Sequence, residues 1–359
     1  MPFINTTQYI TDIDLSFCEY QLARVLPFTV IDPSDEKLKE TPLPNAKYYI
    51  TGGLYEKKGQ KIRHSERIGR IGGDYALSVN PERLKPLPLY YKYVRRCFQR
   101  HSSGNLMKYP FIPGRSLYLG HWMGHYGHFI TEFLSHLWCI DQLSEIDQIV
   151  VLPFLFDERK VVVKSWHKTL LQRLGLSHID IVVLDKQYIL DQVVVPQQGW
   201  IVNQTVNRQI KLVYEKITLS SAESNQKGLY FLSRKQEHYK RLANLAEIEA
   251  VFERHNFKIV FPENLSMIEQ LDIYSSASCL ASTSGTGLHN SVFAKSSALI
   301  IELGDMRNRQ KTLPMQRGAT ELLNQKHFFI PYQGSSNGVL DVSLLEIELK
   351  TILAEKEVV

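Results

Sequence analysis

The chain has 359 residues, of which 44% are hydrophobic and 22% charged, and its formal net charge is +5. This composition is typical of a globular protein with two domains or one large one, and it excludes an intrinsically disordered chain. No apolar run approaches the roughly 20 residues of a membrane-spanning helix, and the N-terminus has no secretory signal pattern. The four cysteines are scattered without a CxxC pair, so we expect reduced thiols and a cytoplasmic protein.

Positive charge is concentrated in two segments near the N-terminus, KKGQKIRHSERIGR at residues 57–70 and KYVRRCFQRHSSGNLMK at residues 92–108. Such runs are most often solvated surface, and they also suit an anionic lipid or glycan. No nucleic-acid-binding motif accompanies them, so we expect no nucleic-acid partner. An anionic surface at the inner face of the plasma membrane is the expected place for these segments.

Secondary-structure signals are irregular at first and regular later. The first hundred residues hold short strand-like runs (AKYYIT, YALSV), followed by SLYLGHW. The chain then alternates between strands and helices. The predicted strands are DQIVVLP, IDIVVL, QVVVP, GLYFLS, FKIVF, SCLAST and ALIIELG. The predicted helices are VVVKSWHKTLLQRLGL, residues 204–217, RLANLAEIEAVFERH, SMIEQLDIYSSA and a helix after Gly287. This alternation predicts parallel strands with crossover helices, and hence a doubly wound α/β domain in the C-terminal half.

Three regions follow from this pattern. Residues 1–200 are expected to form an N-terminal domain and residues 201–335 a second domain, with residues 197–205 (QQGWIVNQT) as the linker. Residues 336–359 contain VSLLEIELKTILAEK, whose apolar residues recur at helical spacing. We therefore expect a C-terminal helix there.

A candidate ligand site lies in SCLASTSGTGLHNSVFAKSSALIIELG, residues 278–304. Small residues between a strand and a helix let a ligand approach the backbone, and the helix N-terminus offers N–H groups. Glu302 comes 17 residues after Gly285, close to where dinucleotide-binding folds place an acid for a ribose hydroxyl. The alternative is a turn of small residues with a structural role.

The run LSRKQEHYKR follows GLYF, so Ser233 and Arg234 sit where the predicted strand ends, the place where α/β domains put ligand contacts. An arginine there can pair with a phosphate through two hydrogen bonds, although a plain surface arginine is the alternative. A nicotinamide-dependent oxidoreductase is a competing hypothesis. Its glycine fingerprint normally lies in the first βαβ unit, whereas the glycines here come late in the predicted sheet.

The stretch GHWMGHYGHFITEFLSH, residues 120–136, raises the question of a metal centre or a catalytic base. Its ionisable residues are His121, His125, His128, Glu132 and His136. The glycines argue against one continuous helix and predict a strand, a turn and then a helix from His128. His128 and Glu132 then share one face, and a carboxylate among aromatic residues has the raised pKa that suits a general base. A metal centre and structural histidines stay open as alternatives.

Four blocks of the sequence, taken in order, resemble glycosyltransferase family 61. This family includes bacterial capsule and lipopolysaccharide glycosyltransferases as well as eukaryotic xylosyl- and N-acetylglucosaminyltransferases. The blocks are GHFITEFLSHLW, YFLSRKQEHYKRLANLAEIE, FPENLSMIEQLDIYSSASCLAST and SGTGLHNSVFAKSSALIIEL, within residues 110–305. In the second block Ser233, Arg234, Arg241 and Asn244 are in register. In the last block Gly285, Gly287, Leu288, Asn290 and Glu302 match the family's signature.

The sequence departs from the family pattern at three positions. Ser284 stands where the family has its signature histidine, Thr286 stands for an alanine, and Phe129 for a tryptophan. The Ser284 difference favours an alternative function, a non-catalytic glycan- or nucleotide-binding member of the same fold.

The resemblance implies an α/β protein of GT-B architecture, with two Rossmann-like domains facing across a cleft. The second domain would hold the donor and the first the acceptor. It also implies an inverting, metal-independent hexosyl- or pentosyltransferase without a cofactor. A nucleotide sugar, with a UDP-sugar as the first expectation, would donate to a capsule or lipopolysaccharide glycan or its lipid-linked precursor.

The resemblance also assigns roles to individual residues. Stabilising the leaving diphosphate would fall to Arg234, with Lys235 beside it, and to the helix N-terminus at Gly285–Gly287. The expected donor-binding residues are Ser233, Arg234, Lys235, Ser284, Gly285, Thr286, Gly287, Asn290 and Glu302. Glu132 is the expected base that deprotonates the acceptor hydroxyl, with His128 beside it. No metal ligand is assigned.

Overall fold

The computed structural model describes the chain in segments that fall into two compact units. The described residues are 10–12, 14–31, 48–55, 69–71, 110–143, 145–152, 161–185, 188–201, 205–219, 228–234, 242–334, 336 and 338–357. Unit 1 consists of Met1–Asp12, Val163–Ser177 and Asn203–Val359, and unit 2 of Ile13–Val162 and His178–Val202. The basic segment 92–108, nearly all of segment 57–70 and the predicted strand YALSV lie outside the described residues.

Unit 1 is built on a five-stranded sheet in the order β12-β11-β13-β14-β15, in which every pair is parallel. Its strands are β11 (Gly228–Leu232), β12 (Lys258–Val260), β13 (Ala277–Thr283), β14 (Leu299–Leu303) and β15 (His327–Ile330). Counted from β11, the spatial order is 2-1-3-4-5, a doubly wound order in which ligands bind at the point where the winding reverses. That switch point lies between β11 and β13. The predicted doubly wound α/β domain is confirmed.

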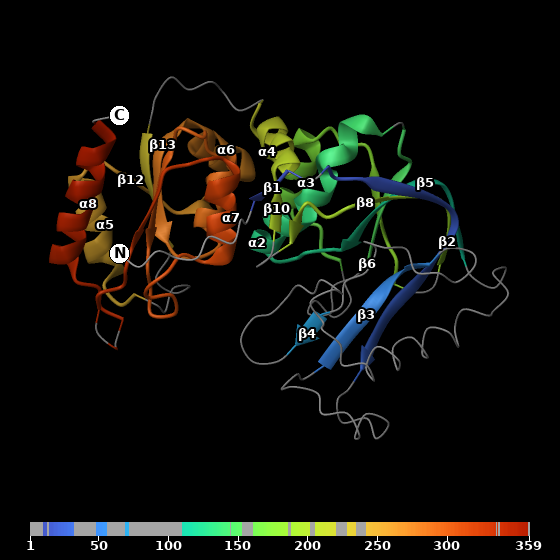
Figure 1. Cartoon of the computed structure of the whole chain (residues 1–359), viewed down its shortest axis with the longest axis horizontal. Helices are drawn as coiled ribbons and strands as arrows, with labels where there is room; N and C mark the ends of the chain where they lie inside the picture. Colours follow the sequence, from blue (N-terminus) through green and yellow to red (C-terminus); the bar gives the residue numbers. More distant parts are fainter. Residues whose placement is uncertain are drawn as a thin grey trace. The chain divides into compact units, whose positions relative to one another are not determined.

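Helices cover both faces of this sheet (Figure 1). α5 (Leu245–Arg254) and α8 (Val342–Glu357) lie on one face, where Phe252 and Leu349 pack into a core with Ile301 of β14. On the other face lie α6 (Met267–Ser276), α7 (Pro314–Leu322) and the 3-10 helix η9 (Leu288–Phe293). The rest of the unit contains β1 (Ile10–Thr11), α3 (Ser165–Arg173), β10 (Thr205–Asn207), η6 (Arg208–Ile210), α4 (Lys211–Thr218) and η8 (Pro262–Asn264). β1 pairs with β10 in parallel.

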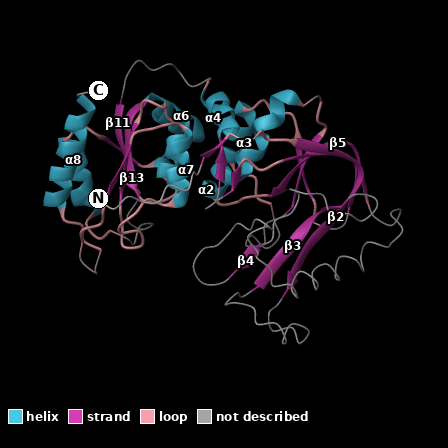
Figure 2. Cartoon of the chain, in the orientation of Figure 1, coloured by secondary structure: helices cyan, strands magenta, loops and turns pink. Residues whose placement is uncertain are grey.

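Unit 2 contains a seven-stranded mixed sheet in the order β4-β3-β2-β8-β5-β6-β7. Its strands are β2 (Phe17–Ile31), β3 (Tyr48–Tyr55), β4 (Gly69–Ile71), β5 (Phe111–His121), β6 (Gln148–Leu152), β7 (Asp180–Val183) and β8 (Tyr188–Pro196). Of these, β2, β3, β4 and β5 are labelled in Figure 2. The half formed by β8, β5, β6 and β7 is parallel, and β2, β3 and β4 add to it antiparallel. The short β9 (Trp200–Ile201) follows. Unit 2 is thus α/β like unit 1, with an antiparallel extension.

The long strand β2 differs from the expectation of short runs in the first hundred residues. It spans 15 residues, pairing with β8 and with β3. The β2–β3 register shifts between Leu26 and Thr29, around Pro27, whose nitrogen has no hydrogen to donate to a sheet. An irregularity in the pairing therefore lets a proline-containing sequence continue as one strand. Among the described helices, none has the length and apolar character needed to cross a membrane.

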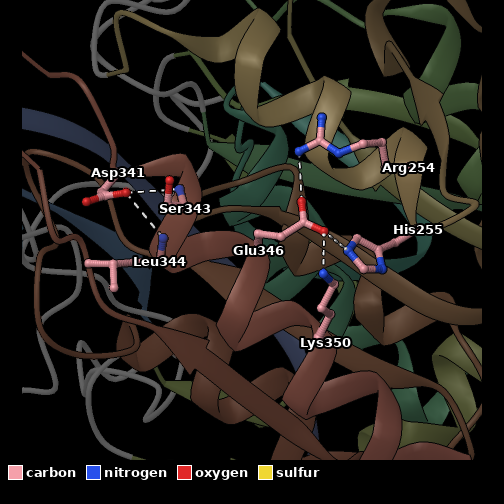
Figure 3. Close-up of polar contacts among 7 residues, drawn as sticks. All are labelled: Arg254, His255, Asp341, Ser343, Leu344, Glu346 and Lys350. Atoms are coloured by element: carbon pink, nitrogen blue, oxygen red, sulfur yellow. Dashed lines mark hydrogen bonds and ion pairs between the residues drawn. The ribbon is translucent and has the colours of Figure 1, made fainter.

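The C-terminal helix α8 is held by polar contacts at its start and along its side (Figure 3). The Asp341 carboxylate accepts from the N–H groups of Ser343 and Leu344, at 2.9 and 3.2 Å. The Glu346 carboxylate accepts from Arg254 at 2.8 Å and is bonded to His255 at 2.7 Å, at the end of α5. Lys350 Nζ lies 3.4 Å from the same carboxylate. Arg254, and then His255, lower the pKa of Glu346 from 4.5 to about 2.

We expect the contribution of Glu346 to stability to depend on pH. Because its pKa is lower in the folded state, the carboxylate stabilises the fold fully above pH 4.5, and this stabilisation is lost as the pH falls from 4.5 toward 2. Glu346→Gln should therefore unfold at a lower temperature than the unmodified protein at pH 7, and the difference should close in that acid range. Thermal denaturation between pH 7 and pH 2.5 measures it. Glu348→Gln, an exposed change on the same helix, is the control, and a difference independent of pH would contradict the assignment.

Candidate functional site

Two chain segments meet at the carboxyl edge of the unit 1 sheet, at its switch point. β11 ends at Leu232, which pairs with Ser282 of β13, so the residues that follow the two strands emerge side by side. Arg234 follows β11 and is half-buried. Residues 284–287, which we call the signature loop, follow β13, and its Gly285, Thr286 and Gly287 are half-buried. Lys235 and Arg241 lie outside the described residues.

Ser233 fixes this edge of the sheet through two hydrogen bonds. Its backbone N–H donates to Val260 O at 2.8 Å, and its hydroxyl donates to the Glu249 carboxylate of α5. The residue is 3% exposed. Ser233 therefore fixes the end of β11 to its neighbouring strand and to α5, immediately before Arg234.

The signature loop has a defined backbone. Gly285 has a φ of +140°, in the region that favours glycine. The predicted helix after Gly287 is the 3-10 helix η9 of six residues, and its first turn uses its own N–H groups: Leu288 N donates to Gly285 O and Asn290 N to Gly287 O. The Asn290 side chain is buried and donates to the Tyr274 hydroxyl and to Gly287 O, both at 3.0 Å. Asn290 thus fastens the loop to α6.

Ser284 and Glu302 bind each other beneath the loop. The Ser284 hydroxyl donates to Glu302 Oε1 at 2.7 Å, and Asn308 Nδ2 donates to the same hydroxyl at 3.1 Å. Ser284 is 1% exposed and Glu302 0%, and Glu302 Oε2 lies 3.4 Å from His327 Nε2. In this arrangement the two side chains face each other, so residues 285–287 are the part of the loop that is open to a ligand. Contacts of Ser284 and Glu302 with a donor stay a prediction.

In unit 2, the histidine-rich stretch forms an irregular helical segment. It begins with one α turn, α2 (Tyr126–His128), continues as the π-helix η3 (Phe129–Phe133) and ends as the 3-10 helix η4 (Leu134–Gln142). The strand, turn and helix predicted for this stretch are confirmed, although the helix is not a regular α-helix. Isolated π turns occur frequently at functional sites.

The π turn joins a buried carboxylate to a half-buried imidazole. Glu132 Oε2 is hydrogen-bonded to His128 Nδ1, with side-chain exposures of 1% for Glu132 and 19% for His128. Trp122, Phe129 and Phe133 pack together beside them, with ring centroids 4.6 to 5.5 Å apart. A carboxylate in such surroundings fixes the orientation and tautomer of the imidazole, and it stabilises the ring when it gains a proton.

The other histidines of this stretch are arranged differently. His125 is exposed, with its ring centroid 5.3 Å from that of His128. His136 Nδ1 is bonded to the backbone oxygens of Glu132 and Phe133, at 3.1 and 3.2 Å. The side chain of His121 is outside the described part. No group of three or more His, Cys, Asp or Glu residues in the described part is arranged to hold a metal ion.

Residues 126–301 match the family model described as Glycosyltransferase 61. The match begins at the helical segment that carries His128 and Glu132, and it ends in β14 beyond the signature loop. It supports the assignment of this chain to glycosyltransferase family 61. A comparison with curated proteins gives no match.

One segment at the carboxyl edge, residues 305–311, lies beyond the stretch that the glycosyltransferase 61 model matches. Asn308, which holds the Ser284 hydroxyl, belongs to the segment DMRNRQK, residues 305–311. Sequence reasoning did not single out this segment. The sequence nevertheless contains a signal for it, because a cationic run directly follows the predicted strand ALIIELG, and loops at the carboxyl edge of a sheet follow its strands.

We expect Ser284→Ala to lower the free energy of unfolding by about 1–3 kcal/mol, because the buried Glu302 carboxylate loses a hydrogen-bond donor. Urea denaturation measures the loss. Thr286→Ala in the same loop is the matched control, since its half-buried position predicts a change of about 0.5 kcal/mol or less. Equal stabilities of the two variants would contradict a structural role for the Ser284 hydroxyl.

Proposed function

We propose that this protein is an inverting glycosyltransferase, which transfers a hexosyl or pentosyl group from a nucleotide sugar to a hydroxyl group of a glycan. The observation that carries the proposal is the switch point of the unit 1 sheet, where Arg234 and the half-buried residues 285–287 emerge together. Both lie within the stretch that matches the glycosyltransferase 61 model. Ligands of doubly wound sheets bind at this kind of edge.

The donor would bind through its diphosphate. The Arg234 guanidinium can pair with phosphate oxygens, and positive charge aimed at the leaving diphosphate stabilises the charge that develops when the sugar bond breaks. Gly285 and Gly287 let the phosphates approach the backbone. Arg234 would then make the main electrostatic contribution. Ser233 would hold the end of β11 in place, and Asn290 would hold the signature loop.

For the acceptor, we assign the base to His128 and the orienting role to Glu132. Glu132 is almost fully buried, whereas His128 retains exposed surface, so an acceptor hydroxyl can approach the imidazole more easily than the carboxylate. Nδ1 is bonded to Glu132, so Nε2 is the nitrogen that takes the proton. The acceptor oxygen then bonds to the anomeric carbon, and the bond from that carbon to the diphosphate oxygen breaks. The nucleoside diphosphate leaves, and the configuration is inverted.

We further propose which unit supplies each part of the site, which donor and acceptor react, and where in the cell the reaction occurs. Under a GT-B architecture, unit 1 would supply the donor site and unit 2 the base. The donor would be a UDP-sugar, and the acceptor a capsule or lipopolysaccharide glycan or its lipid-linked precursor. The basic segments 57–70 and 92–108 suit an anionic lipid surface, which supports a place in the cytoplasm at the inner face of the plasma membrane.

Nucleotide binding is the first test. A ligand that binds only the folded state stabilises it by about 2.7 kcal/mol at a hundredfold excess over its dissociation constant, so the right nucleoside diphosphate should raise the melting temperature. Arg234→Gln should reduce this shift, whereas Lys258→Gln, an exposed change at the start of β12, should not. The ligands tested are a panel of common nucleotides and nucleotide sugars, because the nucleobase of the donor is not known in advance. If no member of the panel shifts the melting temperature, the transferase hypothesis fails.

Turnover is the second test, measured as nucleoside diphosphate released from the donor identified by binding. His128→Ala should lower turnover by about 10²–10⁴-fold, the usual contribution of a positioned base, while nucleotide binding is retained. Glu132→Gln should also lower turnover and change its pH profile, because the amide does not stabilise the protonated imidazole. His125→Ala is the control. Activity should persist in excess chelator.

Three outcomes would change this interpretation. Undiminished turnover in both His128→Ala and Glu132→Gln would show that the catalytic base does not lie in this helical segment. Loss of activity in chelator, restored by a divalent cation, would replace the metal-independent mechanism. Nucleotide binding without any release of nucleoside diphosphate would support the alternative, a non-catalytic binding protein, to which the buried Ser284 at the family's histidine position points.

A further inference from the structure

A second cationic element borders the signature loop. β14 pairs with β13 in parallel, with Ser282 opposite Glu302 and Thr283 opposite Leu303, so the loops that follow these two strands leave the sheet side by side. The segment after β14, residues 305–311 (DMRNRQK), is called here the cationic loop. It lies outside the stretch that matches the family model.

The cationic loop is fixed internally. Asp305 Oδ1 accepts from the N–H groups of Arg307 and Asn308, at 2.8 and 2.9 Å. The backbones of Asp305 and Asn308 are bonded to each other in both directions, at 3.1 and 3.2 Å. These bonds close a tight turn that presents the side chain of Arg307. A loop ordered in advance loses little conformational entropy when it binds a ligand.

The cationic loop is also tied to its surroundings. Arg309 O accepts from Tyr332 N at 2.8 Å, and Asn308 Nδ2 donates to the Ser284 hydroxyl at 3.1 Å. A Cβ atom at Gly304 would lie 2.7 Å from Tyr332 N and 2.9 Å from Asn308 O, so only glycine fits where the loop begins. The position of the cationic loop is therefore coupled to that of the signature loop through one side-chain hydrogen bond.

The charge of this loop is not balanced within the part of the chain that is described. Arg307, Arg309 and Lys311 are exposed, and the one acid of the loop, Asp305, has no exposed surface. The Arg309 guanidinium lies over the Tyr332 ring, 5.3 Å from its centroid. In the described residues, no ion pair joins Arg307 or Lys311 to a carboxylate. The contrast is with Arg254 and Lys350, which share the Glu346 carboxylate (Figure 3).

We propose that Arg307 and Lys311 bind the diphosphate of the donor, together with Arg234. The inference rests on the proposed function and assigns two further donor-binding residues to the same site. Arg234, the signature loop and the cationic loop follow three neighbouring strands, β11, β13 and β14. A diphosphate at residues 285–287 would then have cations on both sides, and charge-assisted hydrogen bonds from Arg307 and Lys311 would favour it over a monophosphate.

The test measures the affinities of uridine diphosphate, guanosine diphosphate and inorganic pyrophosphate by calorimetry, without divalent cations. Pyrophosphate tests the anion site independently of the base. Arg307→Gln and Lys311→Gln should each weaken the binding of pyrophosphate and of the preferred nucleoside diphosphate by about tenfold, the loss of one hydrogen bond to a charged group. The affinity for the uncharged nucleoside should not change. The melting temperature of each unliganded variant should equal that of the unmodified protein, because both side chains are exposed.

Lys295→Gln is the matched control, since it removes one exposed positive charge elsewhere in unit 1. If Arg307→Gln and Lys311→Gln bind these ligands as Lys295→Gln does while Arg234→Gln binds them weakly, the cationic loop has no role and the proposed function stands. If the unmodified protein binds no nucleotide or nucleotide sugar of the panel, both proposals fall together. Weaker binding in Arg307→Gln and Lys311→Gln than in Lys295→Gln confirms the assignment.

Discussion

The carboxyl edge of the unit 1 sheet depends on the hydrogen bond that the buried Glu302 carboxylate accepts from Ser284. A carboxyl group without exposed surface is costly unless polar partners surround it. Here Ser284 supplies a hydroxyl donor from the neighbouring strand end, and His327 lies beside the second oxygen from β15. Because Asn308 bonds to the same hydroxyl, one buried group fixes the ends of β13 and β14 and the loops that follow them. The half-buried residues 285–287 follow directly after this fixed contact.

Much of the strand and helix order of unit 1 could be predicted from the sequence, because buried parallel strands appear as short apolar runs between helical patterns. The strand β15 and the helix α7 were missed. They follow the cationic loop, whose polar residues give no periodic signal, and β15 is a run of only four residues. In unit 2, charged residues and Pro27 conceal the length of β2, since the extra residue of β2 that accommodates the proline is defined only by its pairing with β3. A single sequence contains no direct signal for such a partner.

For the candidate site, the sequence predicted well which side chains lie on the same helix or strand. It predicted less well which residues those side chains contact. One helical turn separates His128 from Glu132, and their hydrogen bond follows from that spacing. Ser284 and Glu302 were both expected to face a donor. In the structure Ser284 donates to Glu302, because strand pairing places Ser282 opposite Glu302 and Ser284, two residues further along the chain, reaches the carboxylate. That contact depends on two strands that are distant in the sequence. The contacts of Ser284 and Glu302 with a donor stay a prediction.

The π turn at Phe129–Phe133 has a consequence for how the sequence of this segment can vary. A π turn holds one residue more than an α turn, as the bond from Leu134 N to Phe129 O shows. Deleting a single residue there would restore the ordinary α-helical repeat and rotate the preceding turn by about 100° about the helix axis. If the deleted residue lay between His128 and Glu132, the two would stay neighbours, three residues apart, but His128 would be rotated relative to the helical segment that follows, while every side chain of the site was still present. The spacing in this segment is therefore as much a part of the site as the residues themselves, and a gap in an alignment here would mark a change of geometry that no substitution reveals.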